Sequence, residues 1–309
     1  MSSIVVIGSL NMDLVAVASH LPLVGQTLIG SRYWDAPGGK GGNQAYAAAK
    51  LGADVTMLGR VGNDSFGARM RANLESVGCD TRGLTTLDGA SGVALISLAQ
   101  TGENSIIVVP GANDRYMPAD VEADRHLLDE TRMVLLQLEN PLDTVAAAAR
   151  MARQAGARVI LDPAPAPTSL PVTLLQAVDI LTPNETEAAW LTGSASTALS
   201  MEDAAAIARK LRGMGPSTVI MKLGAQGCLL LDRENVIAIP APAVQAIDTT
   251  AAGDEFNGGL AVALVEGASM TQACRFAVHA AALSVTRLGS QASMPSRQEL
   301  DRFYKPAAI

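Results

Sequence analysis

The stretch DTTAAGDEFNGGLA, residues Asp248–Ala261, places small residues between two acidic ones and then continues as an apolar helical pattern. Small residues allow another molecule to approach the backbone closely. The first amides of a helix have no partner within it, so those of Ala252, Gly253 and Asp254 would form a site for an anion. From these residues alone, Asp254 could equally be a helix N-cap, which is the commoner use of Asp at such a position. The stretch therefore predicts a loop that turns into a helix at an anion site or a plain cap.

The composition limits the classes of protein to which the chain can belong. Its 309 residues are 49% apolar and 17% charged, a balance typical of a globular protein with a sizeable core. A net charge of −7 argues against a nucleic-acid surface, and no apolar run approaches the ~18 residues of a membrane span. There is no basic segment of a signal peptide, and Cys79, Cys228 and Cys274 suggest no disulfide framework. We expect a cytoplasmic protein with neither nucleic-acid nor membrane partners.

Short β-branched runs alternate with amphipathic segments along most of the chain. Strands that alternate with helices form βαβ units, so we predict one α/β domain over residues 1–309, with a mostly parallel central sheet and helices on both faces. The expected strands are residues 4–7, 55–58, 133–138, 159–161, 179–181, 219–222 and 228–231. The expected helices are residues 43–51, 65–77, 142–155, 185–191, 202–214, 255–265 and 271–287.

Two segments interrupt this alternation. Residues 14–34 and 93–109 have the pattern of paired strands without helices between them, and QTGEN at 100–104 is typical of a hairpin turn. Such strands do not easily join a parallel sheet. We therefore predict a small separate β-sheet formed by about residues 12–36 and 91–110, which would act as a lid over the strand ends. An interface sheet without a gating role is the alternative.

Polar loops follow two of the early strand segments. GSLNMD, residues 8–13, comes directly after the first strand, and ligands of open α/β sheets bind beyond the carboxyl ends of strands. Asn11 and Asp13 offer the donors and acceptors that a sugar diol needs, although both are also common turn residues. PGGKGG, residues 37–42, surrounds Lys40 with four glycines and leads into a helix, which suits a polar or anionic group.

The two common nucleotide-binding fingerprints are missing from the sequence. A P-loop needs Ser or Thr after its lysine and a glycine six residues before it, whereas Gly41 follows Lys40 and Trp34 holds the position of that glycine. No GxGxxG motif follows a strand, which argues against a dinucleotide-binding dehydrogenase. A further turn, KLGAQGC at residues 222–228, could cradle phosphate with its amides or could be a plain β-turn.

The loops resemble, in order and spacing, the two signatures of the ribokinase-like (PfkB) carbohydrate kinases. The N-terminal signature matches Gly38, Gly39, Asn43 and GRVGNDSFG at residues 59–67, and the C-terminal one, D-T-x-A-A-G-D-x-x-x-G-G/A-L, matches Asp248–Leu260. The resemblance covers essentially the whole chain. It implies a three-layer α/β/α domain with a small β-sheet lid, and an ATP-dependent kinase of the 5-hydroxyl of D-ribose. A kinase of another small sugar (deoxyribose or a hexose) or of a nucleoside is the alternative.

The resemblance also implies roles for individual residues. Asp254 would be the general base, and the amides of Ala252 and Gly253 would stabilise the transferring phosphoryl group. The sugar would be bound by Asn11, Asp13, Gly39, Lys40, Asn43, Glu139 and Asp254. ATP would contact Asn184, Lys222, Leu223, Gly224, Ala225, Gln226, Gly227 and Gly253, with Glu187 serving the Mg²⁺ region. A monovalent cation, K⁺, would lie near Asp248, Thr250, Ser284, Arg287, Gly289 and Ser293.

The family resemblance further implies a homodimer that forms through the β-lid. Apolar residues of the predicted lid are the candidate contacts, namely Leu14, Val15, Val17, Leu28 and Ile29. A regulatory sugar-binding protein that kept the fold but lost the activity would share this architecture. A nicotinamide-dependent dehydrogenase is the third class, which the missing fingerprint disfavours.

The residue after the predicted base departs from the family pattern. Glu255 follows the predicted base directly, where relatives usually carry a small residue or Thr. A second carboxylate could raise the pKa of Asp254 or repel ATP phosphates. It could equally be harmless, since acidic residues are favourable in the first turn of a helix. We expect the second outcome, because consecutive helical residues point about 100° apart.

Overall fold

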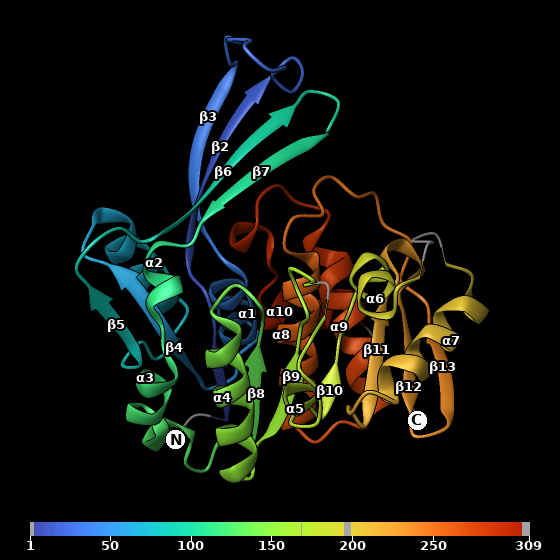
Figure 1. Cartoon of the computed structure of the whole chain (residues 1–309). Coiled ribbons are helices and arrows are strands. Elements are labelled where there is room, and N and C mark those ends of the chain that lie inside the picture. Colours follow the sequence, from blue (N-terminus) through green and yellow to red (C-terminus); the bar gives the residue numbers. More distant parts are fainter. Residues whose placement is uncertain (1–2, 168, 195–198, 305–309) are drawn as a thin grey trace.

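The computed structural model describes residues 3–167, 169–194 and 199–304, which form two β-sheets with helices around the larger one (Figure 1). Neighbouring strands of the larger sheet are parallel except for two antiparallel pairs at one edge. From that edge its nine strands are β13 (Asn235–Ile239), β12 (Cys228–Asp232), β11 (Thr218–Lys222), β10 (Ile180–Leu181), β9 (Arg158–Leu161), β8 (Met133–Leu136), β1 (Ile4–Ile7), β4 (Val55–Gly62) and β5 (Leu84–Leu87).

Helices cover both faces of this sheet and enclose a hydrophobic core on each. One face carries α1 (Lys40–Lys50), α2 (Ser65–Ser76), α8 (Ala252–Val265), α9 (Met270–Ser284) and α10 (Arg297–Phe303). The other carries α3 (Pro118–Ala123), α4 (Leu142–Gln154), α5 (Val172–Leu175), α6 (Glu185–Thr192) and α7 (Met201–Arg212). Side chains alternate along each strand, so Ile4 and Val6 lie in the first core and Val5 and Ile7 in the second. The predicted α/β fold with a mostly parallel sheet is confirmed.

The elements that the sequence did not predict are short or lie at the edges of the fold. They are β5, β13, α3, α5 and α10. Strand β13 is partly exposed at the end of the sheet, and α5 has only four residues. Such segments lack a long apolar period, and their conformation depends on packing against neighbours more than on their own sequence.

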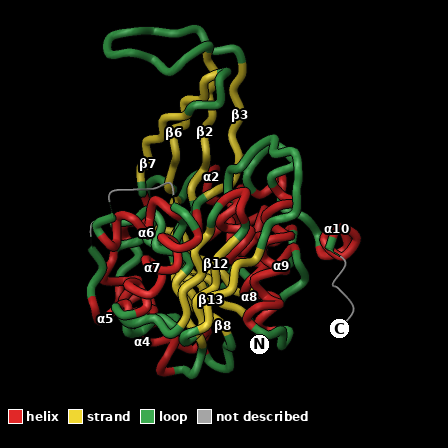
Figure 2. The backbone as a smooth tube through the Cα atoms, turned by 90° about the vertical axis from the view of Figure 1, so that its right-hand side faces the viewer, coloured by secondary structure: helices red, strands yellow, loops and turns green. Residues whose placement is uncertain are grey.

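The second sheet has four strands and projects from one end of the larger sheet (Figures 1 and 2). Its order is β3 (Arg32–Gly38), β2 (Asn11–Ala18), β6 (Gly92–Ala99) and β7 (Asn104–Val109). Strands β6 and β7 form the hairpin expected around QTGEN, while β2 and β6 pair in parallel. A small sheet separate from the main one is therefore confirmed.

The second sheet stands at the carboxyl end of β1. Only Gly8, Ser9 and Leu10 separate β1 from β2, so Asn11 begins the small sheet directly above the parallel strands. This places the polar loops of the sequence between the two sheets. Among the described residues, no helix has the length and apolar character needed to cross a membrane.

Candidate active site

Polar side chains from several parallel strands meet where these strands end. Asn11 follows β1, Glu139 follows β8, Asp162 follows β9 and Lys222 ends β11. The carboxyl ends of parallel strands lie at the same edge of a sheet, so residues far apart in the sequence become neighbours there. The N-termini of α1 and α8 lie at this edge as well: Asn43 of α1 and Asp254 of α8 are joined by a hydrogen bond.

Asp254 lies in the first turn of α8 and is held by two amides of α1. Its side chain is 5% exposed, and its carboxylate accepts hydrogen bonds from Asn43 Nδ2 at 2.9 Å and from Gln44 Nε2 at 3.0 Å. Ala251 occupies the N-cap position, so the interpretation of Asp254 as a simple helix cap is wrong. Burial raises the pKa of Asp254 to about 6, against the opposing effect of the Lys40 ammonium. The residue is a buried carboxylate that ionises just below neutral pH.

The loop before α8 leaves two backbone amides without partners. Ala251 adopts φ 59°, and the Ala252 amide donates to the Thr249 carbonyl at 3.2 Å. The expectation that Ala252 supplies a free amide is therefore not met. Within the part of the chain that the structure describes, the amides of Gly253 and Asp254 form no hydrogen bond. They make the positive end of α8 available to an anion.

Lys222 brings a positive charge to this helix end. A Cβ atom at Gly253 would lie 3.3 Å from Lys222 Nζ, so the ammonium is next to the free amides. Lys222 also forms an ion pair with Asp162 at 2.8 Å. Its backbone is joined to that of Asn184 by an isolated β-bridge. The amides and the ammonium together form a cradle suited to a phosphate group.

Two buried amide side chains, which sequence reasoning missed, link Asp254 to this ion pair. Gln44 Nε2 lies 3.0 Å from an Asp254 oxygen and 3.2 Å from an Asp162 oxygen, and Gln44 Oε1 accepts from Gln137 Nε2 at 2.7 Å. All of these side chains except Lys222 are at most 5% exposed. The only signal in the sequence was a pair of amides, Asn43 and Gln44, at the start of a helix that follows the glycine loop.

The predicted sugar-binding residues lie together beside Asp254. Glu139 Oε2 accepts from the Lys40 amide at 3.0 Å and from Asn11 Nδ2 at 3.4 Å, and Ser9 Oγ also donates to it. Asn113, which follows β7 and was not predicted, donates to Asn11 Oδ1 at 2.8 Å. Sequence reasoning missed Ser9 and Asn113 because small polar residues in loops give no distinctive pattern.

Ionisable side chains of this pocket have shifted pKa values because they lie close together and are buried. Burial, together with the nearby carboxylates of Glu139 and Asp254, raises the pKa of Asp13 to about 7. Burial disfavours the charged form of Lys40, but the surrounding carboxylates, Asp254 first, outweigh this and raise its pKa. Gly39 has φ 82°, and a Cβ atom there would lie 2.5 Å from the Asn11 amide nitrogen, so the close approach of the glycine loop requires glycine.

Most of the residues predicted for the nucleotide lie in the turn that follows Lys222 and at the start of α6. Leu223 to Gly227 form the tight connection between β11 and β12, with a short 3₁₀ helix at Gly224–Gln226. Asn184 and Glu187 form a capping box at the start of α6, in which both Glu187 oxygens accept hydrogen bonds from Asn184 at 2.8 Å. Burial raises the pKa of Glu187, and the Lys222 ammonium opposes this. Helix capping therefore accounts for Asn184 and Glu187 as well as a ligand role does.

The residues predicted for a monovalent cation lie in the loop before α8 and in the segment from the end of α9 to residue 293. Several of their side chains already have hydrogen-bond or ion-pair partners. Asp248 accepts hydrogen bonds from Thr250 Oγ1 at 2.6 Å and from the Gly289 amide at 2.8 Å, so it ties the two loops together. Ser284 and Ser293 are buried and donate to nearby carbonyls, whereas the Arg287 guanidinium pairs with Glu299 at 2.8 Å. No group of three or more His, Cys, Asp or Glu suited to a metal occurs in the described residues.

Glu255 does not behave as a surface residue of a first helical turn. It is completely buried, and neither carboxylate oxygen has a hydrogen-bond partner among the described residues. Burial raises the pKa of Glu255 to about 8, the Lys50 ammonium opposes this, and Asp254 adds to it. The expectation of a favourable first-turn acid is therefore wrong, because burial without a hydrogen-bond partner makes the charge of Glu255 costly.

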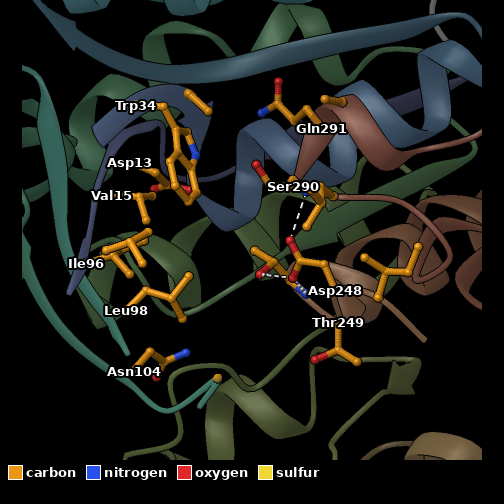
Figure 3. Close-up of a pocket in the computed structure, with 18 of the residues that line it drawn as sticks. Asp13, Val15, Trp34, Ile96, Leu98, Asn104, Asp248, Thr249, Ser290 and Gln291 are labelled. Atoms are coloured by element: carbon orange, nitrogen blue, oxygen red, sulfur yellow. Dashed lines mark hydrogen bonds between the residues drawn. The ribbon is translucent and has the colours of Figure 1, made fainter. Parts of the chain in front are cut away.

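A cavity of about 1010 Å³ opens next to the polar cluster (Figure 3). One wall is the small sheet, represented by Asp13, Val15 and Trp34, and the opposite wall is formed by Asp248, Thr249, Ser290 and Gln291. The cavity is therefore bounded by both the projecting sheet and the loops that precede α8 and α10.

Comparison with known proteins places this geometry in a family. Residues 1–297 match the model of the pfkB family of carbohydrate kinases. The chain is 41% identical to a ribokinase of Haemophilus influenzae over 99% of each chain, and 37% identical to a deoxyribokinase of Salmonella typhi over 97% of this chain and 98% of the other. A solved structure of Arabidopsis thaliana ribokinase complexed with ribose and ATP is similar with a TM-score of 0.91, at 35% identity over 98% of each chain. The chain belongs to the pfkB family of carbohydrate kinases.

Proposed function

We propose that this protein is a ribokinase, which transfers the γ-phosphoryl group of ATP to the 5-hydroxyl of D-ribose. The observation that carries the proposal is the placement of Asp254: a buried carboxylate held by Asn43 and Gln44, in a helix turn whose first free amides lie beside Lys222. The ribokinases of Haemophilus influenzae and Bacillus subtilis, 41% and 40% identical, support ribose as the substrate.

The reaction needs little covalent chemistry from the protein. The sugar would be bound by Asn11, Asp13, Gly39, Lys40, Asn43 and Glu139. With a pKa of about 6, Asp254 is largely ionised at neutral pH and can take the proton of the 5-hydroxyl. The hydroxyl oxygen then bonds to the γ-phosphorus while the bond to the β-phosphate oxygen breaks and ADP leaves. Because charge spreads over the transferring group, the amides of Gly253 and Asp254 with Lys222 would stabilise it.

The nucleotide and its magnesium ion would lie on the Lys222 side of the site. The amides of the turn from Leu223 to Gly227 would line the ATP site, with Asn184 beside the phosphates. Glu187 and Asp162 are carboxylates near Lys222, and such oxygen donors fit Mg²⁺, which usually retains waters and binds phosphate. The ion would neutralise charge on the β- and γ-phosphates.

A monovalent cation, K⁺, would act through the loop before α8. Asp248 and Thr250 are in this loop, and Ser284, Arg287, Gly289 and Ser293 belong to the segment that it contacts. The loop ends in Ala251 at φ 59°, so an ion bound there would set the backbone that presents the free amides. Rates in K⁺ should exceed those in a large organic cation at the same ionic strength, and equal rates would remove this part of the proposal.

The small sheet would serve as a lid and as the contact of a homodimer. Its cavity face would exclude water, a competing phosphoryl acceptor. Its other face exposes Leu95 at 44% and Ile107 at 63%. Leu95 is the register partner of both Ile107 and Leu14. Val15 and Val17 line the cavity instead, so of the strand residues proposed for the dimer only Leu14 lies on the outer face. A cytoplasmic location suits the three unpaired, buried cysteines.

A panel of sugars with ATP tests the function. Purified protein should give its highest kcat/KM with D-ribose, and 2-deoxyribose is the decisive competitor because a deoxyribokinase is 37% identical to this chain. A higher kcat/KM for deoxyribose, a hexose or a nucleoside would overturn ribose as the substrate. No phosphorylation of any sugar would favour a binding protein instead.

A further inference from the structure

The small sheet forms one wall of the cavity, and the pairing of its strands arranges the side chains of that wall in rows. Trp34 of β3, Val15 of β2, Ile96 of β6 and Ile106 of β7 are register partners in turn, and all four line the cavity. They form one continuous apolar row across the sheet. Figure 3 shows Trp34 and Val15 beside Asp13, across the cavity from Ser290 and Gln291.

A single carboxylate, Asp13, lies next to this apolar row, and its register partners are Ala36 and Ala94. Asp13 is two residues from Val15 on the same strand and faces the same cavity, so it lies about 7 Å along the strand from the apolar row. Two residues further out, Arg32, Val17, Leu98 and Asn104 form another row, and the Arg32 guanidinium lies 5.8 Å from the centre of the Trp34 indole. With increasing distance from Asp254, the side chains of the wall are thus the Asp13 carboxylate, then the apolar row with Trp34, and then a row of polar and apolar residues.

Trp34 is the large aromatic group of this wall, and it is 37% exposed. Sugars have polar edges formed by hydroxyls and apolar faces formed by C–H groups. A pocket that orients such a ligand combines a few polar groups with aromatic or aliphatic walls. Asp13 supplies a polar group and the Trp34 row supplies the apolar wall. No role was assigned to Trp34 by the sequence motifs.

We propose that Trp34 is a specificity-determining residue, whose indole packs on the C–H face of the sugar whose hydroxyls contact Asn11 and Asp13. This inference rests on the proposed sugar kinase function. The Trp34 wall selects a neutral sugar ring by its apolar face, while Asp13 selects hydroxyls at its edge. Because the indole contacts the ring in both the ground state and the transition state, its loss affects KM more than kcat.

The chain itself offers a matched control, since it contains two tryptophans, Trp34 and Trp190. Trp190 lies on α6 and is 57% exposed. The Trp190→Phe protein therefore reports Trp34 fluorescence alone, and the Trp34→Phe protein reports Trp190 alone. Titration with D-ribose in the absence of ATP should change the emission of the first protein with saturation and leave that of the second unchanged. An unchanged Trp34 signal at ribose concentrations well above KM would overturn the proposal.

Steady-state kinetics give the second readout. Trp34→Ala should raise KM for ribose about 10-fold with kcat within about 2-fold, and Trp34→Phe should raise KM less than about 3-fold because a ring remains. Trp190→Ala is the control and should leave both constants unchanged. An unchanged KM in Trp34→Ala, with an altered sedimentation coefficient, would assign Trp34 to a contact between copies instead.

The failure of this inference is distinguishable from failure of the proposed function. If ribose is phosphorylated but neither the Trp34 emission nor the KM of Trp34→Ala responds, the role of Trp34 is wrong and the function stands. If another sugar is the substrate and alone changes the Trp34 emission, the role of Trp34 stands and ribose is wrong.

Discussion

The first turn of α8 places two neighbouring carboxyl groups in opposite situations. Asp254 faces α1, where two amides donate to it and Lys40 is close enough to favour its charge. Glu255 points into the interior, with no hydrogen bond to either oxygen within the described chain. Both are buried, yet the pKa of Asp254 is about 6 and that of Glu255 about 8. The difference shows that hydrogen bonds and nearby charge, more than exposure, decide which carboxylate can act as a base near neutral pH.

The largest effect should come from removing the charge of Asp254. Asp254→Asn keeps the size of the side chain but cannot accept a proton from the sugar, so we expect kcat to fall by about 10³-fold or more. Sugar binding, measured by calorimetry without ATP, should be largely retained. The matched control is Glu255→Gln, which should keep activity within about 3-fold. Full activity of Asp254→Asn would show that another group is the base.

The second largest effect should come from the amide that positions Asp254. Gln44→Leu removes the donor shared by Asp254 and Asp162, so we expect kcat to fall on the order of 10- to 100-fold. Loss of a stabilising hydrogen bond should also raise the pKa of Asp254 and shift the acid limb of the pH–kcat profile upward.

Gln154→Leu is the control for this substitution, since Gln154 is exposed at the end of α4. Gln44→Glu keeps the shape but adds a third carboxylate, so it should shift the same limb further. A change in Tm without a shift of the pH profile would mean that Gln44 supports the fold and not the base.

The pH dependence of the unmodified protein tests the Asp254 side of the comparison. The base must be ionised, and its pKa is raised to about 6, so activity should be present above that pH and lost as the pH falls through it. Protonation of Asp13, whose pKa is about 7, should reduce sugar binding in the same direction. We expect kcat/KM for the sugar to decline from about pH 7 downward. A flat profile to pH 5 would contradict both assignments.

The smallest effect on activity, but a measurable one on stability, should come from Glu255. Its pKa is 4.5 when exposed and about 8 in the folded protein, so its ionisation opposes folding progressively as the pH rises through that window. Glu255→Gln removes this penalty and should raise the free energy of unfolding at pH 8 by an amount on the order of a few kcal/mol. The gain should vanish near pH 4.

Thermal unfolding at several pH values measures this difference. Glu202→Gln, in the exposed first turn of α7, is the matched control and should show no comparable pH dependence. If Glu255→Gln is no more stable than the unmodified protein at pH 8, Glu255 has a partner or a hydration that stabilises its charge.

Much of the fold was predictable because strand and helix periods are local properties of the chain. Strand β1 was predicted with its observed bounds, and α8 was expected from Glu255 onward, three residues after its start at Ala252. Alternation of these elements limits the sheet to a mostly parallel arrangement, and hairpin residues separate the small sheet from it. The edge strand β13 and the short α3 were missed, since their conformation depends on neighbours.

The sequence by itself determined the family, and it predicted the loop residues proposed to bind the substrates and Asp254 as the base to be tested. Each of these depends on residue types at fixed spacing within one segment. Only the tertiary structure decided what surrounds them: the shared donor Gln44, the ammonium of Lys222 beside Gly253, the row that carries Trp34, and the burial of Glu255 without a partner. These contacts join residues far apart in the chain, and desolvation acts only once folding has brought them together.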